Sequence, residues 1–284
     1  MNRKAFVLSF MVFLFALIII LLVASSRELR TTLRDDYKYV SLIDRVSTNY
    51  DYTEDLFLDL YEKVGNTKIY SDSNKAVFSL RLPDKQSKDN YDLNAVSLRN
   101  FILQDTEALS YSINLLNADL TTLNIHPFDI NFSQADINNV RDNNSVFFSP
   151  SGIEFRKYFV EIKLLNQDFN ELTASISSCG SCFFKIELDL EVRDANNAIV
   201  STFSDTDIDA NSLSSIFIKT NEPPVNDIEI FLTSLGNFRL SNNSGKSFDL
   251  NAGIMFPENE LSFPEIHYPK GFLKVKSILG IEKK

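Results

Sequence analysis

The sequence predicts an α+β protein with a long N-terminal transmembrane and amphipathic helix, a second packed helix, and a C-terminal antiparallel, sandwich-like β domain. Three observations predict this class: an unbroken apolar run near the N-terminus, an apolar stripe at helical spacing after it, and a period of two beyond Asn117. They divide the chain into a transmembrane anchor (1–26), a helical stalk region (27–118) and a β-rich domain (119–284).

The apolar run extends from Ala5 to Ala24, with Ser9 as its one polar side chain. About 20 helical residues match a hydrocarbon core of ~30 Å, and inside lipid the backbone must satisfy its own hydrogen bonds. The run therefore predicts a single-pass helix with the lipid bilayer as its partner. A cleaved signal peptide is the alternative, although such peptides have an apolar core of roughly 7–15 residues.

Charges around this run give conflicting indications of topology. Arg3 and Lys4 precede it, whereas Arg27, Arg30 and Arg34 follow it, and this excess favours a cytoplasmic C-terminal flank. The large C-terminal part behind a very short N-terminal tail, and a close pair of cysteines, favour the opposite orientation. We therefore expect a protein of the cell membrane whose C-terminal part is extracytoplasmic.

Apolar residues at spacings of three and four predict a helix over residues 27–64, with Gly65 as its stop and an alternative break between Ser47 and Thr53. A second helix is predicted from Leu93 to Leu116, packed against Phe57 and Leu60 of the first. Residues 76–82 alternate like a strand, although Ser73 is a suitable cap for a short helix there.

Alternation of apolar and polar residues predicts the strands of the β domain. It is clearest from Phe184 to Val192, followed by turn residues 194–197 and a returning strand from Ala198 to Phe203. Short strands at this spacing are typical of a sandwich. Further strands are predicted around Val160–Leu164 and at Leu172–Ser178, Leu213–Lys219, Ile228–Leu232, Phe248–Met255 and Phe272–Ile278.

Composition argues against several classes of function. Lys and Arg total 28 against 38 Asp and Glu, giving a net charge of −10 without the basic clusters that nucleic-acid binding requires. With two histidines and eight glycines, the chain offers no catalytic triad and no phosphate-binding glycine loop. His126 and His267 lack the spacing of zinc ligands. We expect no enzyme activity, no catalytic or metal-binding residues and no cofactor.

The only cysteines form the motif Cys179-Gly180-Ser181-Cys182. Redox dithiols of this spacing lie at a helix N-terminus, which lowers the thiol pKa, whereas a strand follows this motif. A structural disulfide that closes a turn is therefore the favoured interpretation. Free thiols and redox or metal chemistry remain the alternatives.

Two further patterns concern surface loops. Asp205-Thr206-Asp207-Ile208-Asp209 resembles a calcium loop, but Ala210 and Ile216 stand where an EF-hand requires glycine and glutamate, so a solvated turn is favoured. Asn131, Asn143 and Asn242 match the N-glycosylation acceptor pattern, which is frequent by chance in a chain rich in Asn and Ser.

The order Arg3-Lys4-Ala5-Phe6, long apolar helix, amphipathic continuation and β-rich C-terminal domain resembles type IV pilins and the pilin-like membrane proteins of small-genome archaea. The resemblance implies cleavage of a short basic leader at Lys4, Ala5 and Phe6. The chain departs from bacterial pilins at Phe10, where they carry a glutamate.

The sequence thus predicts a membrane-anchored, extracytoplasmic structural or adhesive surface protein of pilin-like type, with self-association or other envelope proteins as partners. One alternative is a membrane-tethered ligand-binding or sensing module that does not polymerise. An envelope disulfide oxidoreductase that uses Cys179 and Cys182 is the third.

Overall fold

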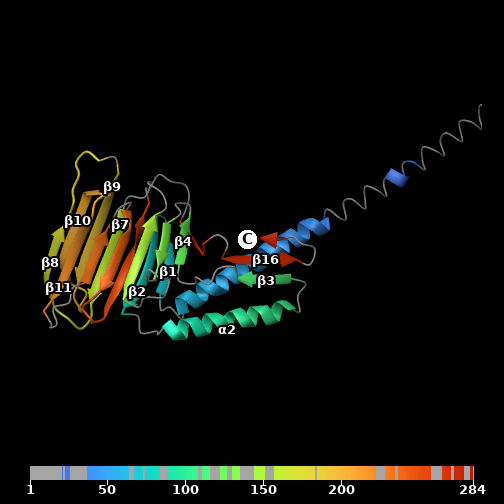
Figure 1. Cartoon of the computed structure of the whole chain (residues 1–284), viewed down its shortest axis with the longest axis horizontal. Helices are drawn as coiled ribbons and strands as arrows, with labels where there is room; N and C mark the ends of the chain where they lie inside the picture. The colour runs from blue at the N-terminus through green and yellow to red at the C-terminus, as the bar shows by residue number, and fades with distance from the viewer. Residues whose placement is uncertain are drawn as a thin grey trace, which may run out of the picture.

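A computed structural model describes residues 21, 23–25, 37–63, 67–72, 74–83, 88–107, 111–115, 122–126, 130–134, 144–150, 157–182, 184–221, 228–233, 236–256, 264–269, 272–277 and 282–283. Strands make up 55% of the structure and helices 24%. The predicted α+β class with a long N-terminal helix is therefore wrong: the fold is mostly β (Figure 1).

Two large sheets form the main body of the molecule. The six-stranded sheet has the order β1 (Thr67–Asp72), β2 (Lys75–Leu82), β14 (Phe248–Met255), β7 (Lys157–Leu164), β9 (Lys185–Arg193) and β10 (Ile199–Asp209). The eight-stranded sheet has the order β15 (Glu265–His267), β4 (Thr122–His126), β5 (Ile130–Ser133), β6 (Ser145–Pro150), β13 (Phe238–Asn242), β12 (Ile228–Leu232), β11 (Ser214–Thr220) and β8 (Phe169–Ser175). Paired strands are antiparallel except β7 and β9, which are parallel.

The core lies between these sheets. Strands such as β7 and β9 bury every second residue. Aromatic rings meet across the interface: Phe78 of the six-stranded sheet stacks on Phe132 of the eight-stranded sheet with ring centroids 3.8 Å apart. The ring centroids of Tyr158 and Phe238, which also belong to opposite sheets, are 5.0 Å apart. The buried Tyr158 hydroxyl donates a hydrogen bond to the carbonyl of Gly236. Burial of this phenol raises its pKa well above the usual value.

Residues 67–82 belong to this core rather than to the helical region in which the sequence placed them. They form the hairpin β1–β2, and β2 pairs along its whole length with β14. The strand interpretation of residues 76–82 is thus confirmed. The hairpin lies in the sheet because Ala76, Phe78, Leu80 and Leu82 all bury their side chains on one face.

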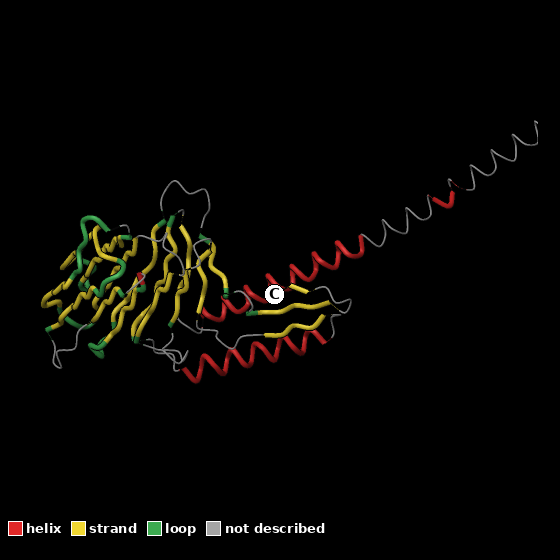
Figure 2. The backbone as a smooth tube through the Cα atoms, turned by 45° about the horizontal axis from the view of Figure 1, so that its top comes forward, coloured by secondary structure: helices red, strands yellow, loops and turns green. Residues whose placement is uncertain are grey.

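A smaller lobe lies at one end of the sandwich (Figures 1 and 2). It contains a helix over residues 37–63, helix α2 (Lys88–Glu107) and a three-stranded sheet in the order β17 (Glu282–Lys283), β16 (Leu273–Ser277) and β3 (Tyr111–Leu115). The C-terminal part of the chain holds the first helix in place. Phe57 packs edge-on against Phe272 at 5.3 Å, and its carbonyl accepts a hydrogen bond from the Tyr268 hydroxyl at 3.0 Å.

Several helix predictions need correction. The second helix ends at Glu107 instead of Leu116, because Ile113 and its neighbours pair with β16 as a strand. Phe57 packs against Tyr268 and Phe272 of the C-terminal segment, long-range contacts without a local sequence signal. The helix over residues 37–63 is continuous through Ser47 to Thr53, as the main prediction had it, so the alternative of a break there is wrong.

The predicted single-pass membrane architecture is also wrong. Within the described residues, no helix is both long and apolar enough to cross a bilayer. The helix over 37–63 contains charged residues such as Asp44, Asp51 and Glu54, so its sequence is not a continuous apolar run. The predicted transmembrane helix, the cell-membrane localisation and the extracytoplasmic placement are therefore withdrawn. Most of the segment from Ala5 to Ala24 lies outside the described residues, as do Lys4, Ala5 and Phe6.

Candidate functional site

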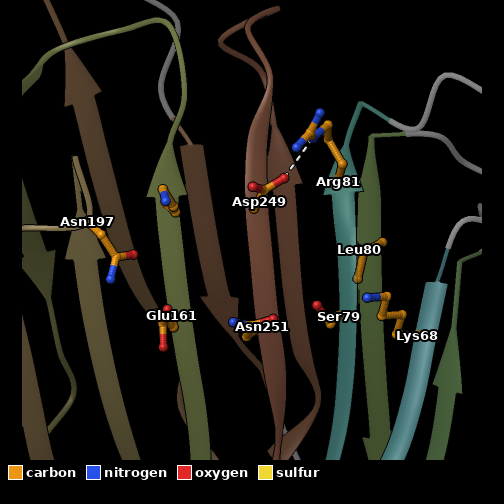
Figure 3. A pocket seen from close by; sticks show the side chains of 9 residues that line it. Lys68, Ser79, Leu80, Arg81, Glu161, Asn197, Asp249 and Asn251 are labelled. Carbon is orange, nitrogen blue, oxygen red and sulfur yellow. Dashed lines mark hydrogen bonds and ion pairs between the residues drawn. The ribbon is translucent and has the colours of Figure 1, made fainter. Parts of the chain in front are cut away.

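The outer face of the six-stranded sheet contains an open polar hollow of about 500 Å³. Figure 3 shows its side chains, which come from four strands and from the turn between β9 and β10. We call this site the polar hollow and define it by Lys68, Ser79, Leu80, Arg81, Glu161, Lys163, Asn197, Asp249 and Asn251.

Strand register explains why these polar groups meet. Lys68 is opposite Ser79, Ser79 is opposite Asn251, and Asn251 is opposite Glu161, so the four residues form one row across the sheet. Arg81, Asp249 and Lys163 form the adjacent row. Because side chains of a strand alternate between faces, both rows point away from the buried core (Figure 3). Asn197 joins them from a turn residue with φ of 70°.

Both carboxylates of the hollow are paired with arginine. The Arg81 Nε donates to Asp249 Oδ1 at 2.6 Å, and this hydrogen bond raises the pKa of the guanidinium. Glu161 Oε1 lies 3.5 Å from Arg193 Nε, and Arg193 also pairs with Glu191. The Arg81–Asp249 contact is a charge-assisted hydrogen bond, whereas Arg193 Nε lies beside Glu161 without donating a hydrogen bond among the described residues.

The two lysines of the hollow are in a different situation. Across the described ranges, the ammonium groups of Lys68 and Lys163 form no ion pair and no hydrogen bond. The hollow thus contains three cationic and two anionic side chains, although the whole chain carries a net charge of −10. Its arrangement suits a ligand that brings an anionic group and hydrogen-bonding hydroxyls.

A second, smaller hollow of about 380 Å³ continues the same face towards β10 and shares Glu161 with the first. Asp189 lies within it and accepts hydrogen bonds from Lys157 at 2.7 Å and from Ser204 at 2.7 Å. Partial burial would raise the pKa of Asp189, but these hydrogen bonds and the Lys157 charge outweigh burial and lower it.

Gly253 on β14 lies very close to β2 and to Phe159, a residue of the second hollow. A Cβ at this position would lie 2.0 Å from the backbone oxygen of Ala76 and 2.9 Å from the ring of Phe159. Only glycine therefore allows the two strands and the Phe159 ring to approach so closely. Lys75 lies above the same ring, 5.7 Å from its centroid.

Cys179 and Cys182 are joined in a disulfide with Cα atoms 5.5 Å apart. The segment follows β8 and crosses from the eight-stranded to the six-stranded sheet, where Cys179 N donates to Asp207 O at 2.9 Å. Lys185 reinforces the crossing by contacting Gly180 O at 3.2 Å and Asp207 at 2.6 Å. Strand β9 follows the motif, so the disulfide lies at a chain crossing and not at a helix N-terminus.

The aspartates predicted to form a solvated turn lie at the end of β10 instead. Their carboxylates serve separate local contacts: Asp205 accepts from the backbone of Asp207, Asp207 pairs with Lys185, and Asp209 accepts from Asn211 N and Ser212 Oγ. The hydrogen bonds from Asn211 and then Ser212 lower the pKa of Asp209. These carboxylates do not converge on one point.

The two histidines, distant in sequence, lie on neighbouring strands. His126 is on β4 and His267 on β15, and Glu265 is directly opposite His126. His267 contacts Glu265 at 3.3 Å and Glu54 at 3.5 Å. Nevertheless, no group of three or more His, Cys, Asp or Glu among the residues described could hold a metal ion.

The candidate glycosylation sites differ in accessibility. Asn131 is partly buried on β5, and its side-chain oxygen accepts a hydrogen bond from Asn124 at 3.3 Å. Asn242 is only 4% exposed, and its Nδ2 donates to Lys246 O at 2.9 Å, so this nitrogen is engaged within the fold. Asn143 lies outside the described residues.

Comparison with known proteins gives no match: no family model, no curated protein and no solved structure matches this chain. A function must therefore be inferred from the geometry of the chain itself. The polar hollow was not predicted from sequence, because its residues come from five separate segments and meet only through strand register.

Proposed function

We propose that this protein is an adhesive recognition module that binds an acidic saccharide in the polar hollow of the six-stranded sheet. The observation that carries the proposal is that Lys68 and Lys163, in an open polar depression, have no ion-pair or hydrogen-bond partner in the part of the chain that the structure describes. A carboxylate on the ligand would replace water at these ammonium groups and form charge-assisted hydrogen bonds.

The groups between the lysines suit the hydroxyls of a sugar. Ser79 and Asn251 lie between Lys68 and Glu161 in the same row and offer a hydroxyl and an amide, which donate and accept hydrogen bonds. Tyr70 lies two residues after Lys68 on β1, on the same face, and 49% of its surface is exposed. Its ring can pack against the apolar face of a sugar while its hydroxyl stays in water.

The proposed role is non-catalytic because of how the carboxylates are held. Hydrolysis of a glycosidic bond commonly needs two accessible carboxyl groups beside it, one as general acid and the other as general base or nucleophile. Here Asp249 is occupied by Arg81 and Glu161 lies beside Arg193. Fixed ion pairs of this kind support binding and orientation of a ligand.

Calorimetric titration with a short oligogalacturonate tests this proposal, with its fully methyl-esterified form as the uncharged control. We expect binding that weakens as salt is added, because exposed charge interactions are screened. Lys68→Ala and Lys163→Ala should each weaken binding by roughly tenfold, equivalent to ~1.4 kcal/mol.

Lys219→Ala is the matched control, since Lys219 lies on the eight-stranded sheet and pairs with Glu171 at 3.3 Å. It should leave affinity unchanged. Equal binding of the charged and esterified saccharides, or binding that Lys68→Ala and Lys163→Ala do not alter, would contradict the assignment. Absence of saccharide binding would do the same.

A further inference from the structure

The second hollow continues the polar hollow along the outer face of the six-stranded sheet. The row that begins at Lys68 does not end at Glu161, because Glu161 is opposite Glu191 of β9 and Glu191 is opposite Thr202 of β10. At about 4.8 Å between neighbouring strands, the row from Lys68 to Thr202 extends over roughly 24 Å, which is longer than a single sugar. A saccharide bound in the polar hollow can therefore continue into the second hollow.

The side chains of the second hollow suit an uncharged sugar. Phe159 is opposite Asp189, and Asp189 is opposite Ser204, so these three residues form a row beside the first. The Phe159 ring lines the hollow, where an aromatic ring can pack against the apolar face of a sugar. Thr202 is exposed, and its hydroxyl donates and accepts hydrogen bonds. The Ser204 hydroxyl donates to Asp189 at 2.7 Å and keeps its capacity to accept.

The two hollows differ in charge. Three cationic and two anionic side chains line the polar hollow, whereas among the described residues three carboxylates and no cationic side chain line the second. Lys157 and Arg193 border the second hollow, but each is shared between two carboxylates. The four carboxylates that share these two cations are Glu161, Glu187, Asp189 and Glu191. A carboxylate on the ligand would meet an excess of like charge here.

We propose that the second hollow binds an uncharged sugar of the same saccharide whose acidic sugar lies in the polar hollow. This inference rests on the proposed function and adds the charge pattern of the ligand, which carries a carboxylate at one end of the bound segment and none at the other. Glu161, which belongs to both hollows, marks the change between them. A saccharide that is acidic along its whole length would place a carboxylate beside Asp189 and Glu191, and repulsion would lower its affinity.

Calorimetric titration of the full-length chain with three tetragalacturonates tests the charge pattern. One tetramer is fully charged, and the other two are methyl-esterified on the two sugars at the reducing end or at the non-reducing end. One of the half-esterified tetramers should bind roughly tenfold tighter than the fully charged one, because it combines a carboxylate in the polar hollow with an uncharged sugar in the second.

Thr202→Lys adds a cation to the exposed end of the second hollow. It should improve binding of the fully charged tetramer and so reduce the preference for the half-esterified one roughly tenfold. Thr173→Lys is the matched control, since it places the same substitution at an exposed residue of β8 in the eight-stranded sheet, and it should leave the preference unchanged.

Failure of the inference and failure of the proposed function give different results. If the fully charged tetramer binds as tightly as both half-esterified forms or more tightly, and Lys68→Ala still weakens its binding, the second hollow is not a site for an uncharged sugar and the polar hollow remains the binding site. A Thr202→Lys variant that behaves like Thr173→Lys would likewise overturn the inference. Absence of binding for all three tetramers would overturn the proposed function and this inference with it.

Discussion

The outer faces of the two large sheets are covered by different kinds of side chain. On the six-stranded sheet, charged residues stand in cross-strand rows, with ion pairs such as Arg81–Asp249 at 2.6 Å and Lys157–Asp189 at 2.7 Å. On the eight-stranded sheet, phenylalanines stand on the outer face beside the ion pair Lys219–Glu171. Phe217 and Phe231 meet edge to face at 6.0 Å, and the Arg239 guanidinium lies 5.3 Å from the centroid of Phe147.

The two faces therefore differ in whether their polar side chains find partners within the protein. Aromatic contacts shield apolar area and leave few hydrogen-bonding groups in need of a partner. On a charged face, some side chains can lack a partner of opposite charge. On the six-stranded sheet this is true of Lys68 and Lys163 among the described residues. The charged face is therefore the better candidate for recognition, and the aromatic face contributes mainly to stability.

The largest expected effect on the charged face comes from Gly253→Ala. The added Cβ would lie 2.0 Å from the backbone oxygen of Ala76, so β2 and β14 must separate locally. We expect a loss of about 1–3 kcal/mol in the free energy of unfolding, measured by denaturant titration. Gly180→Ala is the control, because its Cβ would meet nothing within 4 Å. Equal stability of the two variants would show that the strands do not approach this closely at Gly253.

The aromatic face is tested by a double-mutant cycle on Phe217 and Phe231. Each single change to alanine should destabilise the fold, and the coupling between them should be about 0.5–1.5 kcal/mol, the usual contribution of an edge-to-face pair. Denaturant unfolding of the four proteins gives this coupling. A value near zero would mean that each ring contributes only through its own burial, and the contrast between the two faces would lose its energetic basis.

Strands with a regular period of two could be predicted from the sequence with accurate bounds. Ile228–Leu232 and Phe248–Met255 are confirmed as β12 and β14 with the predicted bounds. Both strands are buried on one face and polar on the other, so local pattern and tertiary environment agree. Strand β10 was predicted only to Phe203, because its continuation through Asp205, Asp207 and Asp209 depends on pairing with residues 177–179.

Features that depend on distant contacts could not be predicted. The second helix was extended to Leu116 because Ile113 fits helical spacing, yet Ile113 pairs with Val275, which is far away in sequence. The polar hollow could not be predicted for the same reason. Lys68 and Glu161 lie in one row only because β2 and β14 are placed between their strands in the sheet. Nothing in the local sequence distinguishes these lysines from the paired ones.

The smallest expected effect concerns the ion pair between Asp189 and Lys157. Both side chains are partly exposed, so Asp189→Asn should lower stability at neutral pH by less than ~1 kcal/mol. Because the pKa of Asp189 is lowered in the folded state, its contribution exists above the unfolded pKa and is lost as the pH falls through the folded value.

The difference in stability between wild type and Asp189→Asn should therefore shrink as unfolding is measured from neutral pH down to about pH 2. Ser204→Ala is the control, since it removes one hydrogen bond to Asp189 and leaves the lysine in place. A difference that is constant with pH would mean that the carboxylate charge is not what stabilises this row. The stability that this row contributes would then come from hydrogen bonds and not from charge. The two faces would differ in the arrangement of their side chains but not in the kind of interaction that stabilises them.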